Sequence, residues 1–222
     1  MSKQLENNNA QTPSSTKLPL NRRRNERSHQ AILKAVAELL EEKGYGGVSI
    51  EAIASRAGVG KQTIYRWWSS KAAVIMEAYK VEIPHNVPIP DTGEVREDLY
   101  QILQQQFTIL TTTTARSAIT GLIAEAQMDS NVAQAFRQQF VATPREATRT
   151  ILVRGITRGE LRTDLNLELV IDAIYSPVWY RLLLKHAPLD DVLAEELVNL
   201  VMEGIANSRS QEEAPRWAAS PT

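Results

Sequence analysis

The chain has 222 residues, 43% hydrophobic and 23% charged, with a formal net charge of −1, as is ordinary for a globular protein of one large or two small domains. It contains no cysteine, which excludes disulfide bonds, thiolate zinc sites and a cysteine nucleophile. We find no run of about 18 apolar residues that could span a membrane and no signal-peptide core, so we expect a cytoplasmic protein without membrane partners.

The first 82 residues of the chain divide into a tail and a helical unit. Residues 1–24 are polar, rich in Asn, Gln, Ser and Pro, and predict a disordered tail. Residues 25–82 predict short helices, the first beginning near Ser28 as N-cap and ending at Gly44. Ser49 is the N-cap of the next helix, which Gly58 ends. A turn at 59–60 leads into a helix over 61–68, and a further helix covers 71–81.

The chain continues with a connector, and after it the apolar residues recur at helical spacing. Residues 83–93 contain Pro84, Pro88 and Pro90 and predict the connector. The body, 94–208, predicts helices over 94–113, 115–129, 131–158, 167–187 and 190–207, and 209–222 forms a C-terminal tail. Residues 143–146, with Pro144 second, resemble a capping box and predict a kink or restart. We therefore expect an all-α protein of about nine helices, a three-helix helix-turn-helix domain followed by a larger helical bundle.

The segment 59–71 has the division of faces that a helix-turn-helix requires. Val59, Ile64 and Trp68 share the face toward the neighbouring helix, where large aromatic residues usually pack. The opposite face has no acidic residue, although a merely solvated helix would carry Glu beside its Lys. It presents side chains that can hydrogen-bond base edges or phosphates. These are Lys61, Gln62, Thr63, Tyr65 and Arg66, with Trp67 beside them.

These residues also resemble a known family. The residues that match form a pattern of about 50 residues without a gap. It begins with a first helix that ends in Gly44-Tyr45 and continues with 48–50, Ala54, 57–59, 63–65, Trp68 and Lys71. The segment 47–79, GVSIEAIASRAGVGKQTIYRWWSSKAAVIMEAY, is similar to the N-terminal domain of the TetR family of bacterial regulators. Residues 158–190 resemble, more weakly, the C-terminal helices of one TetR subgroup.

The resemblance implies roles for the exposed face. Tyr65 and Lys71 would hold phosphates on either side of the major groove, and Thr63 would contact the backbone or a base. Ser49 would bind a phosphate at the start of its helix, which agrees with the preference of helix N-termini for anions. The base readers would be Lys61, Gln62 and Arg66.

Two positions depart from the family pattern. Gly60 stands where a polar cap is usual, which puts a firm start of the third helix in doubt. Trp67 stands where His or Tyr is common. It could flank a phosphate through its indole N–H or simply cover the edge of the groove.

The distribution of charge along the chain agrees with a DNA-binding N-terminal unit. Residues 22–80 contain 11 basic and 6 acidic residues, whereas 81–222 contain 12 basic and 19 acidic residues. A basic unit joined to an acidic body is typical of a DNA-binding domain beside one that does not touch DNA, although chance unevenness would look similar. The basic run at 22–24 could lie along phosphates, and a solvated tail is an equal alternative.

The resemblance further implies a homodimer on a palindromic operator, with half-sites roughly 34 Å apart or a multiple of this, and repression relieved by a small ligand. The helices 167–187 and 190–207 are apolar on more than one face, which favours a four-helix dimer interface or, alternatively, a central position in their own domain. The interface candidates are Ile174, Val178, Trp179, Leu182, Leu197, Leu200 and Val201. The ligand-pocket candidates, which could equally be ordinary core, are Leu103, Phe107, Leu110, Ile119, Leu122, Ile123, Phe136 and Phe140.

Signals for catalysis are weak. The turn at 58–61 hints at a phosphate loop, but Ser55 and Gln62 stand where that motif needs Gly and Ser or Thr. The three histidines have no partner at metal-ligand spacing, and no GxSxG elbow occurs. We expect no enzyme, no cofactor and no metal. The principal hypothesis is a ligand-responsive DNA-binding repressor, and the alternative is a helical small-molecule or protein-binding module without DNA binding.

Overall fold

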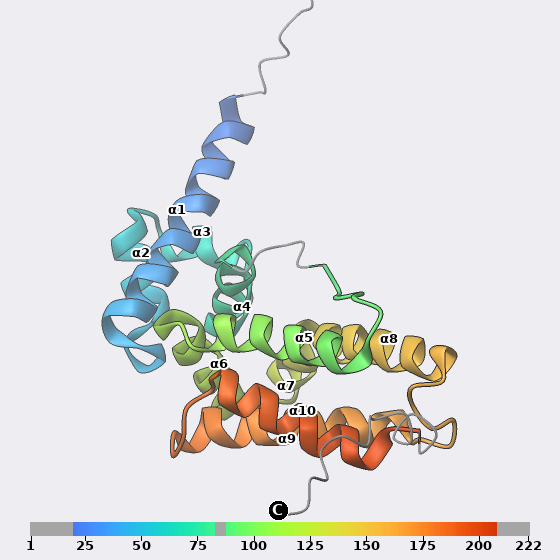
Figure 1. The fold of residues 1–222 in the computed structure, drawn as a ribbon. Helices are drawn as coiled ribbons and strands as arrows, with labels where there is room; N and C mark the ends of the chain where they lie inside the picture. Colours follow the sequence, from blue (N-terminus) through green and yellow to red (C-terminus); the bar gives the residue numbers. More distant parts are fainter. Residues whose placement is uncertain (1–19, 83–87, 208–222) are drawn as a thin grey trace, which may run out of the picture.

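The computed structural model describes residues 20–82 and 88–207, and within these ranges the chain is helical without a strand (Figure 1). The N-terminal head consists of α1 (Leu20–Lys43), the 3₁₀ turn η1 (Tyr45–Gly47), α2 (Ile50–Ala57), α3 (Lys61–Tyr65) and α4 (Lys71–Glu82). The body consists of α5 (Val95–Leu110), α6 (Thr113–Ala126), α7 (Ser130–Phe136), the π-helical η2 (Arg137–Val141), α8 (Ala142–Arg158), α9 (Leu167–Leu184) and α10 (Asp191–Ile205). The prediction of an all-α chain with a head and a larger body is confirmed.

Glycine and serine residues mark the ends and beginnings of helices in the head, as predicted. Gly44 and Gly58 follow α1 and α2 with φ of 65° and 66°, in the left-handed region that side chains other than glycine rarely adopt. The Ser49 hydroxyl accepts from the backbone N–H of Ala52 at 3.1 Å and so caps α2. Gly60, as its missing side chain predicts, gives α3 no side-chain cap.

Two helix boundaries in the head differ from the prediction. The backbone of α1 is already helical at Leu20, so the predicted disordered tail is wrong for 20–24, because this stretch contains helix-forming Arg and no Gly or Pro. Residues 1–19 lie outside the described part of the chain, as do 83–87 of the predicted connector and residues 208–222, which include the predicted C-terminal tail 209–222. The third helix ends at Tyr65 rather than near Trp68, although the Trp68 N–H still bonds the Ile64 carbonyl at 3.0 Å.

The predicted restart around Pro144 appears as a π-helical segment. Helices α7, η2 and α8 follow one another without interruption and together form one long irregular helix. Counted in this way, and without the short turn η1, the described residues form nine helices. Proline has no N–H for the usual bond to the carbonyl four residues earlier, which accounts for the irregular turn at 137–141. The capping-box interpretation is wrong, because α8 begins before Thr143 and has no side-chain cap.

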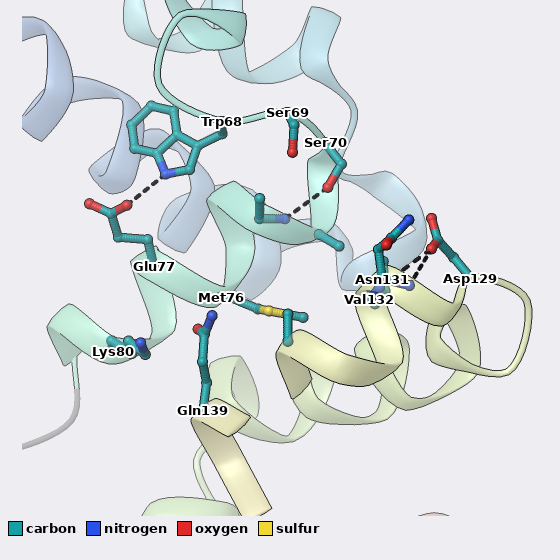
Figure 2. A pocket seen from close by; sticks show the side chains of 13 residues that line it. Trp68, Ser69, Ser70, Met76, Glu77, Lys80, Asp129, Asn131, Val132 and Gln139 are labelled. Carbon is teal, nitrogen blue, oxygen red and sulfur yellow. Dashed lines mark hydrogen bonds between the residues drawn. The ribbon is translucent and has the colours of Figure 1, made fainter. Parts of the chain in front are cut away.

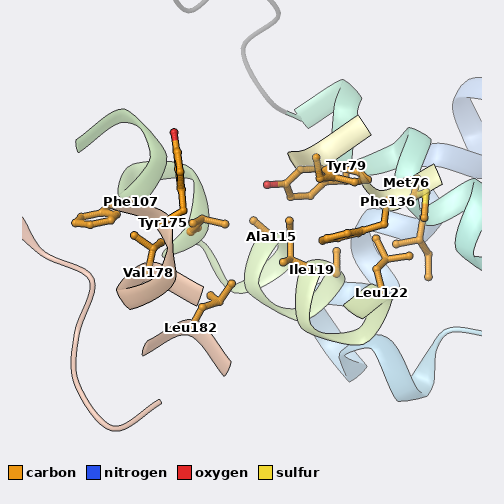
Figure 3. Close-up of a cluster of buried hydrophobic side chains, with 14 of the residues drawn as sticks. Met76, Tyr79, Phe107, Ala115, Ile119, Leu122, Phe136, Tyr175, Val178 and Leu182 are labelled. Atoms are coloured by element: carbon orange, nitrogen blue, oxygen red, sulfur yellow. The ribbon is translucent and has the colours of Figure 1, made fainter. Parts of the chain in front are cut away.

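The head and body share one continuous core through α4. Tyr79 packs edge-on against Phe140 with ring centroids 5.1 Å apart. Figure 3 shows Met76 and Tyr79 lying among Phe136, Ile119 and Leu122, with Phe107, Tyr175 and Val178 further into the body. Since α4 belongs to the head and also packs against the body, a displacement of helices in the body can be transmitted to the head through packed side chains.

Candidate nucleic-acid interface

Helix α3 is held by two buried side chains and exposes the others. Ile64 is fully buried and Trp68 is 4% exposed, as predicted, and Val59 packs partly against the same core. Tyr65 is 54% exposed and Trp67 44%, and Lys61, Gln62 and Arg66 are also exposed. Thr63 is half-buried. The predicted division of faces is therefore confirmed, with Thr63 at its edge.

Trp68 joins α3 to both α1 and α4. Its indole Nε1 donates to Glu77 Oε2 at 2.7 Å, an interaction shown in Figure 2. Glu77 Oε1 lies 2.8 Å from His29 Nε2, and the His29 ring stacks on Trp68 with centroids 4.9 Å apart. These contacts fix the short recognition helix, which its own backbone hydrogen bonds alone would not stabilise.

Two of the predicted base readers have partners within the head. Lys61 Nζ lies 2.5 Å from Glu51 Oε1, and this hydrogen bond lowers the pKa of Glu51. Arg66 Nη2 donates to Asn25 Oδ1 at 3.1 Å, and its guanidinium lies 5.8 Å from the centre of the Trp67 ring. The carboxylate of Glu51 comes from α2, so it adds an acidic group beside a face that by sequence has none.

Lys71, a predicted phosphate contact, instead interacts with Tyr45 and with Glu125 of the body. It is half-buried, its Nζ is 4.0 Å from the centre of the Tyr45 ring, and it is 3.7 Å from Glu125 Oε2. Glu125 is at the end of α6, so Lys71 connects the head to the body. To hold a phosphate as the resemblance implies, Lys71 would have to leave this position or share it with the DNA.

Tyr45 is enclosed by one face of α6. Its backbone N–H donates to Ser117 Oγ at 2.9 Å and its hydroxyl donates to Glu125 Oε2 at 2.5 Å. Ser117, Gly121 and Glu125 are four residues apart and therefore share a face of the helix. Burial, and then the hydrogen bond to Glu125, raise the pKa of Tyr45. We call these four residues, with Lys71, the Tyr45 clasp.

Gly121 leaves the space that the Tyr45 ring occupies, and replacing it should disturb the clasp. A Cβ at Gly121 would lie 2.0 Å from Tyr45 Cγ, far inside van der Waals contact. We expect Gly121→Ala to lower the free energy of unfolding by about 1–3 kcal/mol through overpacking. The matched control is Gly204→Ala in α10, where a Cβ meets nothing within 4 Å and helix propensity should raise stability slightly. Equal effects in urea unfolding would show that the close contact is not important.

The predicted ligand pocket is corrected in part. A small cavity of about 50 Å³ lies in the body, and of the predicted residues only Leu110, Ile119 and Phe140 line it. The other five pack into the core, because apolar residues at helical spacing face inward whether or not a cavity is there: Leu103, Phe107, Leu122, Ile123 and Phe136. The lining that the prediction missed includes Tyr79, Gln106, Arg145, Tyr175 and Trp179.

A larger and open groove of about 650 Å³ lies between α4 and α7 (Figure 2). Met76 and Val132 are apolar parts of its lining, and Glu77, Lys80 and Gln139 contribute polar groups. The sequence did not predict this groove, because its two walls come from helices distant in the chain.

The predicted dimer interface is corrected as well. Four of its residues are buried inside the subunit and cannot meet a partner: Ile174, Val178, Leu182 and Leu197. Trp179 and Val201 are partly buried, and Leu200 is 68% exposed. Other large apolar side chains of α9 and α10 are exposed instead: Leu169, Tyr180, Leu183, Leu184 and Val192. The periodicity showed that α9 has two apolar faces but did not show which one its own domain covers.

The described residues offer neither a metal-binding cluster nor a membrane-spanning helix. Within 20–82 and 88–207, no three His, Asp or Glu residues are grouped so that they could hold a metal ion. Of the helices that the structure describes, none is long and apolar enough to cross a membrane.

Comparison with known proteins supports the sequence resemblance. The family model of the bacterial regulatory proteins of the tetR family matches residues 32–78, and that of the tetracyclin repressor-like C-terminal domain matches 89–201. The HTH-type transcriptional regulator YdeS of Bacillus subtilis is 38% identical over 191 residues, which cover 86% of this chain and 96% of YdeS. A DNA-binding transcriptional repressor TetR of Mycobacteroides abscessus is 30% identical over 183 residues, covering 81% and 94%.

Solved structures have the same architecture. The TetR family transcription regulator SCO0332 superposes with a TM-score of 0.65 at 32% identity, covering 81% of this chain and 99% of that one. The regulator FadR of Bacillus subtilis, solved in complex with stearoyl-CoA, also gives a TM-score of 0.65, at 20% identity and covering 80% and 99%. At that identity the second comparison concerns the fold alone.

Proposed function

Because the chain belongs to the TetR family of bacterial DNA-binding transcription regulators, we propose that it is a cytoplasmic, homodimeric repressor that a small ligand releases from a palindromic operator. The observation that carries the DNA-binding part is the surface of α3. Its exposed positions carry hydrogen-bonding and basic side chains, while Ile64 and Trp68 fix the helix from behind. Such a helix can enter the major groove without losing its packing.

The exposed apolar side chains of α9 and α10 support dimerisation. Leu169, Tyr180 and Leu183 follow one another along α9 at helical spacing, and Val192 and Leu200 lie on α10. The two helices are neighbours in the fold (Figure 1). Their exposed faces would be buried if the same pair of helices from a second copy packed against them as a four-helix bundle.

The small cavity in the structure supports a ligand response. A drug-sized molecule needs several hundred Å³, so a ligand could enter the cavity of about 50 Å³ only if the helices around it moved apart. Ile119 of α6 lines this cavity, and a neighbouring face of α6 holds Tyr45 of η1, the turn that follows α1. Opening would therefore displace the Tyr45 clasp and the head with it. Such coupling requires the ligand to bind the displaced state more tightly than the DNA-competent one.

Selection of random DNA duplexes on the purified full chain tests this function. We expect recovery of a palindrome with half-sites about one helical turn apart. The double variant Gln62→Ala plus Arg66→Ala should lose the sequence preference, since these exposed side chains are the proposed base readers. No enrichment even at low salt would instead favour a helical binding module without DNA activity.

A further inference from the structure

Arg66 is restrained before any DNA is present. One nitrogen of its guanidinium, Nη2, donates to the side-chain oxygen of Asn25 at 3.1 Å. On another side it lies near the indole of Trp67. Asn25 belongs to the N-terminal part of α1, which extends past α3 at the upper end of the head (Figure 1). A side chain from the first helix thus holds a proposed base reader of the third.

Asn25 and Arg66 also line the same polar groove, which has a volume of about 660 Å³. Asn25 and Ser28 line it from α1, residues 58–60 line it from the turn, Thr63 lines it from α3, and Arg66 lines it as the C-cap residue of α3. None of these lining residues is acidic, so the groove presents no negative charge of its own to a phosphodiester strand. At Gly58 and Gly60 no atoms occupy the space where a Cβ would point, so the backbone there is accessible.

We propose that Asn25 is a positioning residue that sets the direction in which Arg66 reads a base, and so determines specificity from outside the recognition helix. This rests on the proposed function above. The guanidinium has five N–H donors, of which Asn25 takes one, and a bidentate contact to guanine O6 and N7 takes two. An arginine already restrained loses less rotamer freedom on binding and favours one geometry over others.

The test compares the wild type with Asn25→Ala, Arg66→Ala and the double variant in random-duplex selection, followed by titration of the selected operator and its single-base variants. We expect Asn25→Ala to reduce discrimination about three- to tenfold at the same base positions at which Arg66→Ala removes it. The double variant should behave like Arg66→Ala alone, because Asn25 acts only through the arginine. The matched control is Gln30→Ala, an exposed amide on the same helix that does not line the groove.

A conservative variant separates positioning from direct contact with DNA. Asn25→Asp keeps the oxygen that accepts from Arg66 but adds a negative charge near phosphates. It should retain the base preference while lowering affinity for all sequences alike. If Asn25→Ala changed other base positions, or added to Arg66→Ala, Asn25 would be reading DNA itself and the inference would be overturned. It would also be overturned if Asn25→Ala behaved like Gln30→Ala. If the wild type selected no sequence, the proposed function would fail and the inference with it.

Discussion

Replacing Trp68 by alanine is expected to lower the free energy of unfolding by about 3–5 kcal/mol, as for other buried tryptophans. The indole is almost completely buried beneath α3, and its Nε1 hydrogen bond joins the end of α3 to Glu77 of α4. Truncation would open a cavity, leave Glu77 without this donor and remove the ring that His29 stacks on. Operator binding should be lost together with stability, because the recognition helix would no longer be fixed.

The neighbouring residue provides the control for this prediction. Trp67→Ala removes a side chain that is 44% exposed, contacts His29 edge-on with ring centroids 5.0 Å apart and lies with its ring 6.3 Å from that of Trp68. Its loss should lower the free energy of unfolding by about 1–3 kcal/mol, the value of two aromatic pairs, and by less than the loss of Trp68. Urea unfolding followed by circular dichroism measures both variants without depending on tryptophan fluorescence. A larger loss for Trp67→Ala than for Trp68→Ala would reverse the assignment of the two faces.

Replacing Leu200 by glutamate is expected to dissociate the proposed dimer. Leu200 is 68% exposed on α10, and in a two-fold interface each substitution occurs twice. If each copy costs about 2 kcal/mol, as for a central interface residue, the dissociation constant rises about 1,000-fold. Sedimentation velocity over a range of protein concentrations would follow the change directly, and operator affinity should fall with it.

Met128 provides the matched control for Leu200. It is 89% exposed and directly follows the end of α6, where Glu125 contacts Lys71 of the head, so Met128→Glu makes a comparable change outside α9 and α10. This variant should sediment like the wild type. If both variants remained dimeric, the interface would have to lie outside the exposed faces of α9 and α10.

Much of the head could be predicted because its signals are local. A capping serine, a glycine with positive φ and an apolar residue every three or four positions each act within one or two helical turns. Ser49, Gly58 and the buried pair Ile64 and Trp68 follow from such signals. The beginning of α1 was missed, because polar helix-forming residues without an apolar face resemble a disordered tail in sequence.

The contacts between elements could not be predicted in the same way. The family resemblance implies a phosphate contact for Lys71 and a base contact for Arg66, but no local signal identifies their partners Glu125 and Asn25, which lie in other helices. These partners meet only when α1 crosses α3 and α6 packs against the end of α1. The same limit applies to α9, where an apolar pattern on two faces did not reveal that Ile174 and Val178 face the domain's own core.

The sequence by itself therefore determined the helical class, the helix-turn-helix and the side chains that α3 exposes, because periodicity and helix ends are properties of neighbouring residues. Only the tertiary structure decided which charged groups pair, how small the cavity in the body is, and which apolar faces stay exposed. The physical reason is that these properties depend on packing between segments far apart in the chain. In that packing the groups around Tyr45, and the contact between Asn25 and Arg66, connect the recognition surface to the rest of the protein.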